Sequence, residues 1–171
     1  MPSISGLSRD QRIRARDRAV QAALLGLSNA SAVHYVTPGT AESALRWDGI
    51  KNRRDARLGQ FPKKSDCSSF TTWCLWNGLH LAFGLGDLVN GAGWTAGFTG
   101  TMITHGKRVR HLANVRRGDC VLYGGSSPSH VTIVVGRREG VPMVVSHGSE
   151  AGPFFVRYDY RNDVMQIRRY I

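Results

Sequence analysis

The chain has 171 residues, 42% of them hydrophobic, which is enough to bury one core without disulfides or a structural metal. Its 23 Lys and Arg against 12 Asp and Glu give a formal net charge of +11, so we expect an acidic partner. No apolar run is long enough for a signal peptide or a membrane span, which argues against membrane insertion. The chain has three cysteines, and because this number is odd we expect them to stay reduced.

The amino-terminal segment, residues 1–30, is predicted to be helical. Ser8, followed three residues later by Gln11, has the pattern of a capping box. We expect the helix to run to about Gly26, because the apolar residues after the cap keep helical spacing: Ile13, Val20, Leu24 and Leu27. The whole chain, residues 1–171, is predicted to form one catalytic domain.

A second helix is predicted to begin at Cys67, with Asp66 as its N-cap. Four residues at i, i+3, i+4 and i+7 would give it a buried face: Phe70, Trp73, Cys74 and Asn77. The preceding residues, 39–64, lack apolar periodicity and are predicted to be a long surface segment that crosses near the site.

The rest of the chain is predicted to be mainly sheet. Residues 84–100 are rich in glycine, and Trp94 within them is a candidate for a substrate groove. From Gly118 onward, turn signals separate β-rich runs at 120–123, 131–135, 143–146, 154–158 and 164–170, which predicts an antiparallel meander. The fold class is therefore α+β, with amino-terminal helices packed on a carboxy-terminal antiparallel β-sheet.

The residue types at the start of the second helix and in the strands point to a thiol nucleophile. Cys67 at a helix start, His130 opening a strand and His147 after the next strand follow the order of a papain-like triad. A free thiol is only a few per cent ionised at neutral pH, so we expect the helix N-terminus and an imidazolium to stabilise the Cys67 thiolate. His147 would then orient His130 through its far ring nitrogen.

Four segments together resemble the NlpC-type cysteine peptidases, papain-like enzymes that cut peptidoglycan stem peptides: DCSSF at 66–70, RRGDCVLY at 116–123, SHVTIVVG at 129–136 and VVSHG at 144–148. The resemblance implies that Cys67 is the nucleophile, His130 the general base and His147 the orienting residue. The chain departs from the family pattern at Ser69 and Thr132, where the family usually has glycine.

A narrower similarity is to the amino-terminal peptidase domain of endolysins from phages of mycobacteria and related actinobacteria. It is carried by the Cys67 helix and by residues 33–35, 46–50 and 93–102. The resemblance implies that Tyr35 helps to hold the oxyanion or the substrate, and Ser68 and Trp94 are further candidates for that task. It also implies storage in the host cytoplasm until a separate protein releases the enzyme to the wall.

We therefore expect a monomeric peptidoglycan hydrolase that acts through an acyl-enzyme, without metal or cofactor. The resemblance implies cleavage between D-isoglutamate and meso-diaminopimelate. The alternatives are a CHAP-type amidase or endopeptidase on the same scaffold, and a non-enzymatic basic module that binds the wall. No nucleic-acid-binding signature is visible, and the basic residues are spread along the sequence, so we expect the anionic cell wall to be the partner.

Overall fold

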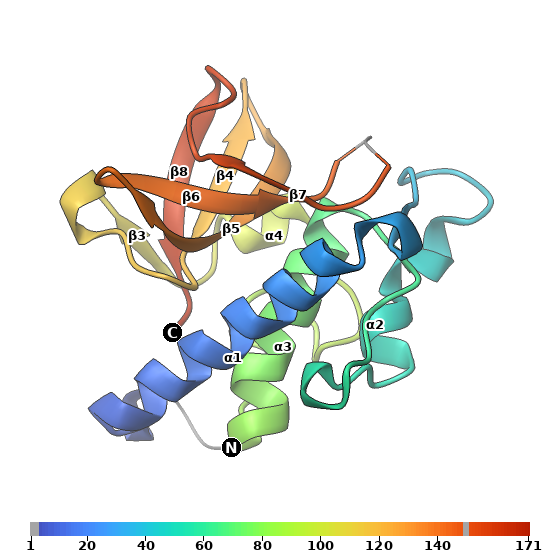
Figure 1. The fold of residues 1–171 in the computed structure, drawn as a ribbon, viewed down its shortest axis with the longest axis horizontal. Coiled ribbons are helices and arrows are strands. Elements are labelled where there is room, and N and C mark those ends of the chain that lie inside the picture. Colours follow the sequence, from blue (N-terminus) through green and yellow to red (C-terminus); the bar gives the residue numbers. More distant parts are fainter. Residues whose placement is uncertain (1–3, 149–150) are drawn as a thin grey trace.

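The computed structural model describes residues 4–148 and 151–171 and has the predicted α+β architecture. Two long helices, α1 (Arg9–Ser28) and α3 (Cys67–Phe83), lie on one side of an antiparallel sheet (Figure 1). Between them the chain forms two short parallel strands, β1 (His34–Tyr35) and β2 (Lys64–Ser65). Short helical turns lie along the chain: α2 at Asp48–Lys51, α4 at Thr99–Met102 and 3-10 turns at Ile4–Gly6, Ala30–Ala32, Ser43–Trp47, Ala56–Leu58 and Leu112–Asn114.

The carboxy-terminal half forms a six-stranded sheet in the order β3-β8-β4-β5-β6-β7 within the described residues. The central strands follow one another as a meander, and the last strand returns to pair with β4. Their bounds are β3 Lys107–Val109, β4 Cys120–Gly124, β5 Pro128–Arg138, β6 Val141–Ser146, β7 Phe154–Arg157 and β8 Val164–Arg169. The meander confirms the strand prediction, while β3, at the sheet edge, was not predicted.

Both faces of the sheet are covered with apolar side chains. The face toward the helices contributes Cys120, Leu122, Val131 and Ile133 to the main core, which also contains Trp73. The opposite face holds a smaller cluster formed by Val121, Tyr123, Val134, Val144 and Ile167. Because side chains alternate along a strand, residue parity decides which face each functional group of β5 and β6 occupies.

Helix α1 begins with the predicted capping box. The Gln11 N–H donates to Ser8 Oγ at 3.2 Å, and the Ser8 N–H donates to Gln11 Oε1 at 2.8 Å. The helix continues to Ser28, two residues beyond the predicted end. Of the apolar residues with helical spacing, Val20 is fully buried, whereas Ile13 and Leu24 are 43% and 40% exposed.

Small residues form the buried face of α1 because α3 approaches it closely. The fully buried positions include Ala15, Ala19, Ala22 and Ala23. At the crossing, a Cβ added to Gly78 of α3 would lie 2.3 Å from the Ala15 carbonyl oxygen. A close crossing of this kind admits glycine and alanine but no larger side chain.

Among the described residues, neither α1 nor any other helix combines the length and the apolar character needed to cross a bilayer.

The crossing of α1 and α3 gives a first prediction. Gly78→Ala should lower the free energy of unfolding by about 1–3 kcal/mol, because the added methyl group must push two backbones apart. This loss should appear although alanine favours a helix over glycine by about 1 kcal/mol. Urea unfolding measures it. Gly100→Ala in α4, where a Cβ would meet nothing within 4 Å, is the control and should show no loss.

Candidate functional site

The start of α3 is fixed by a reciprocal hydrogen-bonded cap. The Ser69 N–H donates to Asp66 Oδ1 at 2.7 Å, and the Asp66 N–H donates to Ser69 Oγ at 2.9 Å. The Ser68 hydroxyl also donates to Asp66 Oδ1, at 2.9 Å. This cap makes Cys67 the first residue of the helix and gives Ser69, which stands where the resemblance expects glycine, a structural task.

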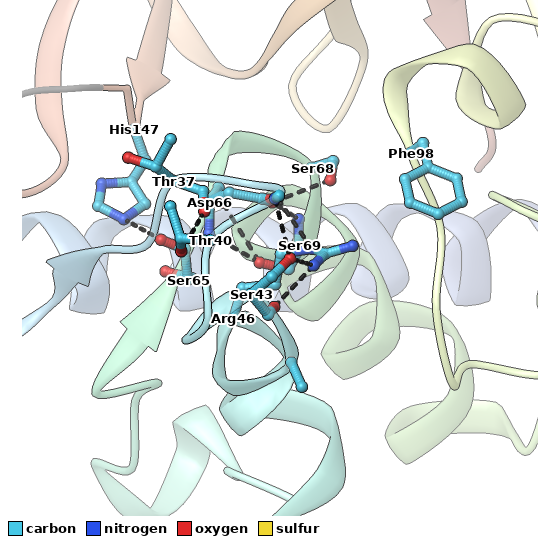
Figure 2. A network of polar contacts seen from close by, with 12 residues as sticks. Thr37, Thr40, Ser43, Arg46, Ser65, Asp66, Ser68, Ser69, Phe98 and His147 are labelled. Atoms are coloured by element: carbon cyan, nitrogen blue, oxygen red, sulfur yellow. Dashed lines mark hydrogen bonds and ion pairs between the residues drawn. The ribbon is translucent and has the colours of Figure 1, made fainter.

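A buried ion pair holds the capping carboxylate. Arg46 Nε lies 3.1 Å from Asp66 Oδ2, and the two side chains are 11% and 3% exposed. The Arg46 guanidinium also donates to the carbonyl oxygen and the hydroxyl of Ser43, so it is anchored on both sides (Figure 2). The Cζ atom of Arg46 lies 5.8 Å from the ring centroid of Phe98, a residue that is 55% exposed.

The strand pair β1–β2 brings the predicted Tyr35 and His147 to the same corner. Tyr35 pairs with Ser65, two residues before Cys67. The carbonyl oxygen of Ser65 lies 3.1 Å from Nε2 of His147 (Figure 2). The His147 ring meets that of Tyr35 edge-on, with 5.2 Å between the ring centroids. Phe70 contacts the same ring at 5.4 Å. His147 therefore links the end of β6 to the segment that leads into α3.

In this structure the residue that contacts the His130 ring is Ser146. The sequence predicts His147 for that role. Nε2 of His130 lies 2.9 Å from Ser146 Oγ, which in turn lies 3.0 Å from the Tyr160 hydroxyl. The register explains the difference. Thr132 pairs with Ser146, so Ser146 shares the sheet face of Thr132 and His130, whereas the next residue is directed to the other face.

The Cys67 thiol lies where α3 packs against β5. The backbone N–H of Val131 is hydrogen-bonded to the Cys67 thiol, which puts the sulfur beside the residue that follows His130. Across the described residues no hydrogen bond joins the thiol to the His130 ring. Ser146 contacts Nε2 of that ring. Catalytic hydrogen bonds are often long before substrate binds.

The resting pair is electrically neutral. Burial raises the pKa of the Cys67 thiol to about 12, and the Asp66 carboxylate adds to this rise. The surrounding N–H groups lower the pKa by less. Burial lowers the pKa of His130 to about 4, with Arg161 and His147 acting in the same direction. The expected thiolate is thus replaced by a buried thiol, because desolvation outweighs the effect of the helix N-terminus.

Two further residues singled out from the sequence lie in the core. Trp94 is 5% exposed, donates its indole N–H to the Leu85 carbonyl oxygen at 3.0 Å and contacts His80. It offers almost no surface to a substrate. Thr132, the second departure from the family pattern, is fully buried, and its Oγ1 lies 3.3 Å from the Tyr123 hydroxyl.

Sequence reasoning missed four residues of this region: Arg46, Phe98, Ser146 and Tyr160. The contact of Ser146 with His130 could be predicted only if the pairing of β5 with β6 were known, because that register decides which residues of β6 share a face with His130. Arg46 stands in a segment that carries the resemblance, but its pairing with Asp66, twenty positions away across an irregular segment, could not be predicted. Within residues 4–148 and 151–171, no group of three or more His, Cys, Asp or Glu side chains is arranged to hold a metal ion.

The charge beside His130 gives a second prediction. Arg161→Ala should raise the pKa of His130 from about 4, because it removes a neighbouring cation and leaves Asp163 unneutralised. NMR titration of the imidazole measures the shift. The acid limb of kcat/KM should move to higher pH with it, since a protonated imidazole cannot act as base.

Arg157→Ala is the matched control. Arg157 also pairs with an aspartate two residues later, at 2.8 Å, but does not contribute to the His130 shift. An unchanged His130 pKa in Arg161→Ala, or an equal change in both variants, would show that the charge of Arg161 does not lower the His130 pKa.

No protein-family model matches the sequence, and no curated protein sequence matches it. Solved structures do match. The peptidoglycan hydrolase RipB from Mycobacterium tuberculosis aligns with a TM-score of 0.62 and 18% identity, over 98% of this chain and 70% of that one. NlpC2 and NlpC1 from Trichomonas vaginalis align with TM-scores of 0.57 and 0.54, each at 16% identity.

The alignments with NlpC2 and NlpC1 cover 92% and 89% of this chain but only 47% and 44% of those proteins. The chain thus spans less than half the length of these two and 70% of RipB. At such identities a likeness in structure shows the fold alone. The chain therefore has the α+β, papain-like fold of these NlpC-type proteins.

Proposed function

We propose that this chain hydrolyses a peptide bond of peptidoglycan, with Cys67 as the nucleophile. The observation that carries the proposal is the position of Cys67 at the first residue of α3, hydrogen-bonded to the β5 backbone next to His130. The fold shared with a peptidoglycan hydrolase supports the choice of substrate. Fold alone does not fix chemistry, so the proposal depends on the site.

The neutral resting pair favours general-base catalysis over a preformed ion pair. As the Cys67 sulfur attacks the scissile carbonyl, His130 accepts the thiol proton and later donates it to the leaving amine. Water then hydrolyses the acyl-enzyme, with His130 again taking a proton. The backbone N–H of Cys67, at the positive end of the helix dipole, is one donor for the oxyanion, and Tyr35 is a candidate second donor.

We assign the orienting role to Ser146 and a supporting role to His147. A hydroxyl at Nε2 can fix the His130 ring as the family's polar third residue does, and Tyr160 extends the chain of hydroxyls. His147 instead joins β6 to Ser65 and so supports the approach to Cys67. Ser68 is engaged by Asp66, so its hydroxyl supports the cap.

The finer features of the function are proposed from the resemblance. The bond would lie between D-isoglutamate and meso-diaminopimelate, and the enzyme would be a monomeric phage endolysin held in the host cytoplasm until its release to the wall. The exposed ring of Phe98 is a candidate to contact the substrate. It lies beside Arg46, which pairs with the N-cap of α3. Mass spectrometry of muropeptides from digested walls identifies the bond and separates this reading from a CHAP-type amidase.

A third prediction concerns the nucleophile. Cys67→Ala should lower hydrolysis of a soluble stem peptide by at least about 10⁴-fold, because the acyl-enzyme can no longer form. Its thermal unfolding should be nearly unchanged. Cys74→Ala, a change to a fully buried thiol that neighbours Cys120, should retain activity. A Cys67→Ala protein that hydrolyses the peptide at the wild-type rate would refute the mechanism.

A fourth prediction separates Ser146 from His147. Ser146→Ala should lower kcat by about 10–100-fold with a smaller change in KM, since general-base catalysis itself contributes about 10²–10⁴-fold. His147→Gln, whose amide can still donate to the Ser65 carbonyl oxygen, should lower kcat less. The opposite ranking would return the orienting role to His147. Steady-state kinetics on a soluble stem peptide decide between the two.

A further inference from the structure

A basic groove lies along β3, the edge strand of the six-stranded sheet. It is a hollow of about 690 Å³, and a neighbouring hollow of about 450 Å³ continues it over β8. Arg108, Val109 and Arg110 line both hollows. The basic residues that define the groove are Lys107, Arg108, Arg110, His111, Arg116 and Arg169.

The positive charge of this groove is largely uncompensated. Arg169 pairs with the buried Asp119 at 2.7 Å. In the described part of the chain, the side chains of Lys107, Arg108, Arg110 and Arg116 form no ion pair, and neither hollow is lined by a carboxylate. The fold thus gathers charges that look dispersed in the sequence.

The charges of this groove also act on Arg16, whose guanidinium donates to the Ile171 carbonyl oxygen. Burial lowers the pKa of its guanidinium, and the positive charges of Arg169 and Arg116 lower it further. Like charges held together repel, so an anion bound between them would stabilise the protein.

Protection of a sheet edge explains only part of the cluster. Charged residues on an edge strand prevent pairing with another chain, and Lys107 and Arg108 suit that task. Arg110 and Arg116 lie beyond the end of β3 and add charge to the hollow without guarding a strand.

The groove is separate from the thiol site. Strands β8 and β4 lie between β3 and β5, so at about 4.8 Å per strand the groove is roughly 14 Å from the strand of His130. A wall polymer bound in the groove would hold the protein on the wall without occupying the proposed thiol site.

The lining indicates the chemistry of the ligand. Guanidinium groups bind phosphate through paired hydrogen bonds, and the two connected hollows suit an extended chain. Phe, Tyr and Trp are absent from the described lining of both hollows, whereas proteins that bind single-stranded nucleic acid stack bases on such rings.

We propose that the basic groove binds a phosphodiester-linked polymer of the cell wall and so retains the enzyme on its substrate. The proposal rests on the proposed wall hydrolase function for the identity of the polymer.

The test compares two variants with equal charge in the inactive Cys67→Ala background, so that walls are not consumed. The groove variant carries Lys107→Gln, Arg108→Gln and Arg110→Gln. The control carries Arg9→Gln, Arg14→Gln and Arg138→Gln, which removes three exposed charges elsewhere. Co-sedimentation with purified walls should show at least about a tenfold lower affinity for the groove variant and little change for the control. Walls stripped of phosphodiester polymers by hydrofluoric acid should bind both variants equally weakly.

Equal binding of the two variants to intact walls would overturn the proposal. A difference that persists on stripped walls would also overturn it, since the anions would then be peptide carboxylates. Loss of binding to single-stranded DNA without loss on walls would identify a nucleic-acid groove instead. With Cys67 intact, the groove variant should hydrolyse a soluble stem peptide within about twofold of the wild-type rate, because screened charges at this distance act weakly. Failure of the wild type to hydrolyse that peptide would refute the proposed function but not wall binding.

Discussion

The site depends on one buried carboxylate. Asp66 caps α3 through Ser69, accepts from Ser68 and pairs with Arg46, and these contacts define where Cys67 begins the helix. Loss of one partner of a buried pair typically costs about 3–5 kcal/mol, because the other charge remains buried and unpaired. Arg46 therefore also ties the irregular segment before α3 to the nucleophile, although it lies far from Cys67 in the sequence.

The same carboxylate makes the thiol harder to ionise. Asp66 lies next to Cys67 and adds to the rise in thiol pKa that burial causes. An N-cap with a neutral side chain would avoid this effect but would leave Arg46 without its partner. The structure thus combines a rigid helix start with a protonated thiol, and the arrangement favours proton transfer during attack over a standing thiolate.

The sequence predicted the elements that depend on local signals. The caps of α1 and α3 and the strands of the meander follow from short patterns, and the structure has them. The buried face of α1 could not be predicted, because it depends on the close approach of Gly78. Strand β3 has only three residues and two exposed cations, so its pairing with β8 comes from tertiary context.

The sequence motif singled out Cys67 and His130 as a proposed pair but did not determine which neighbour contacts the imidazole. The motif ends in adjacent Ser146 and His147, which point to opposite faces of the sheet. Only the pairing of Thr132 with Ser146 determines which of them meets His130. A shift of one residue in this register would exchange their positions, so a family pattern that tolerates several polar residues cannot decide between them.

The connection between β7 and β8 acts on His130 in two ways. Tyr160 contacts the Ser146 hydroxyl that holds the ring, and Arg161, lying over Tyr123, lowers the pKa of the same ring through its charge. Tyr160 helps to hold the imidazole in place, and Arg161 adds to the effect of burial in lowering the imidazole pKa. Both depend on how this short connection packs against Tyr123, whose ring lies 5.8 Å from that of His130. The basicity and the orientation of the proposed base are therefore coupled through a segment outside the motif that identifies it.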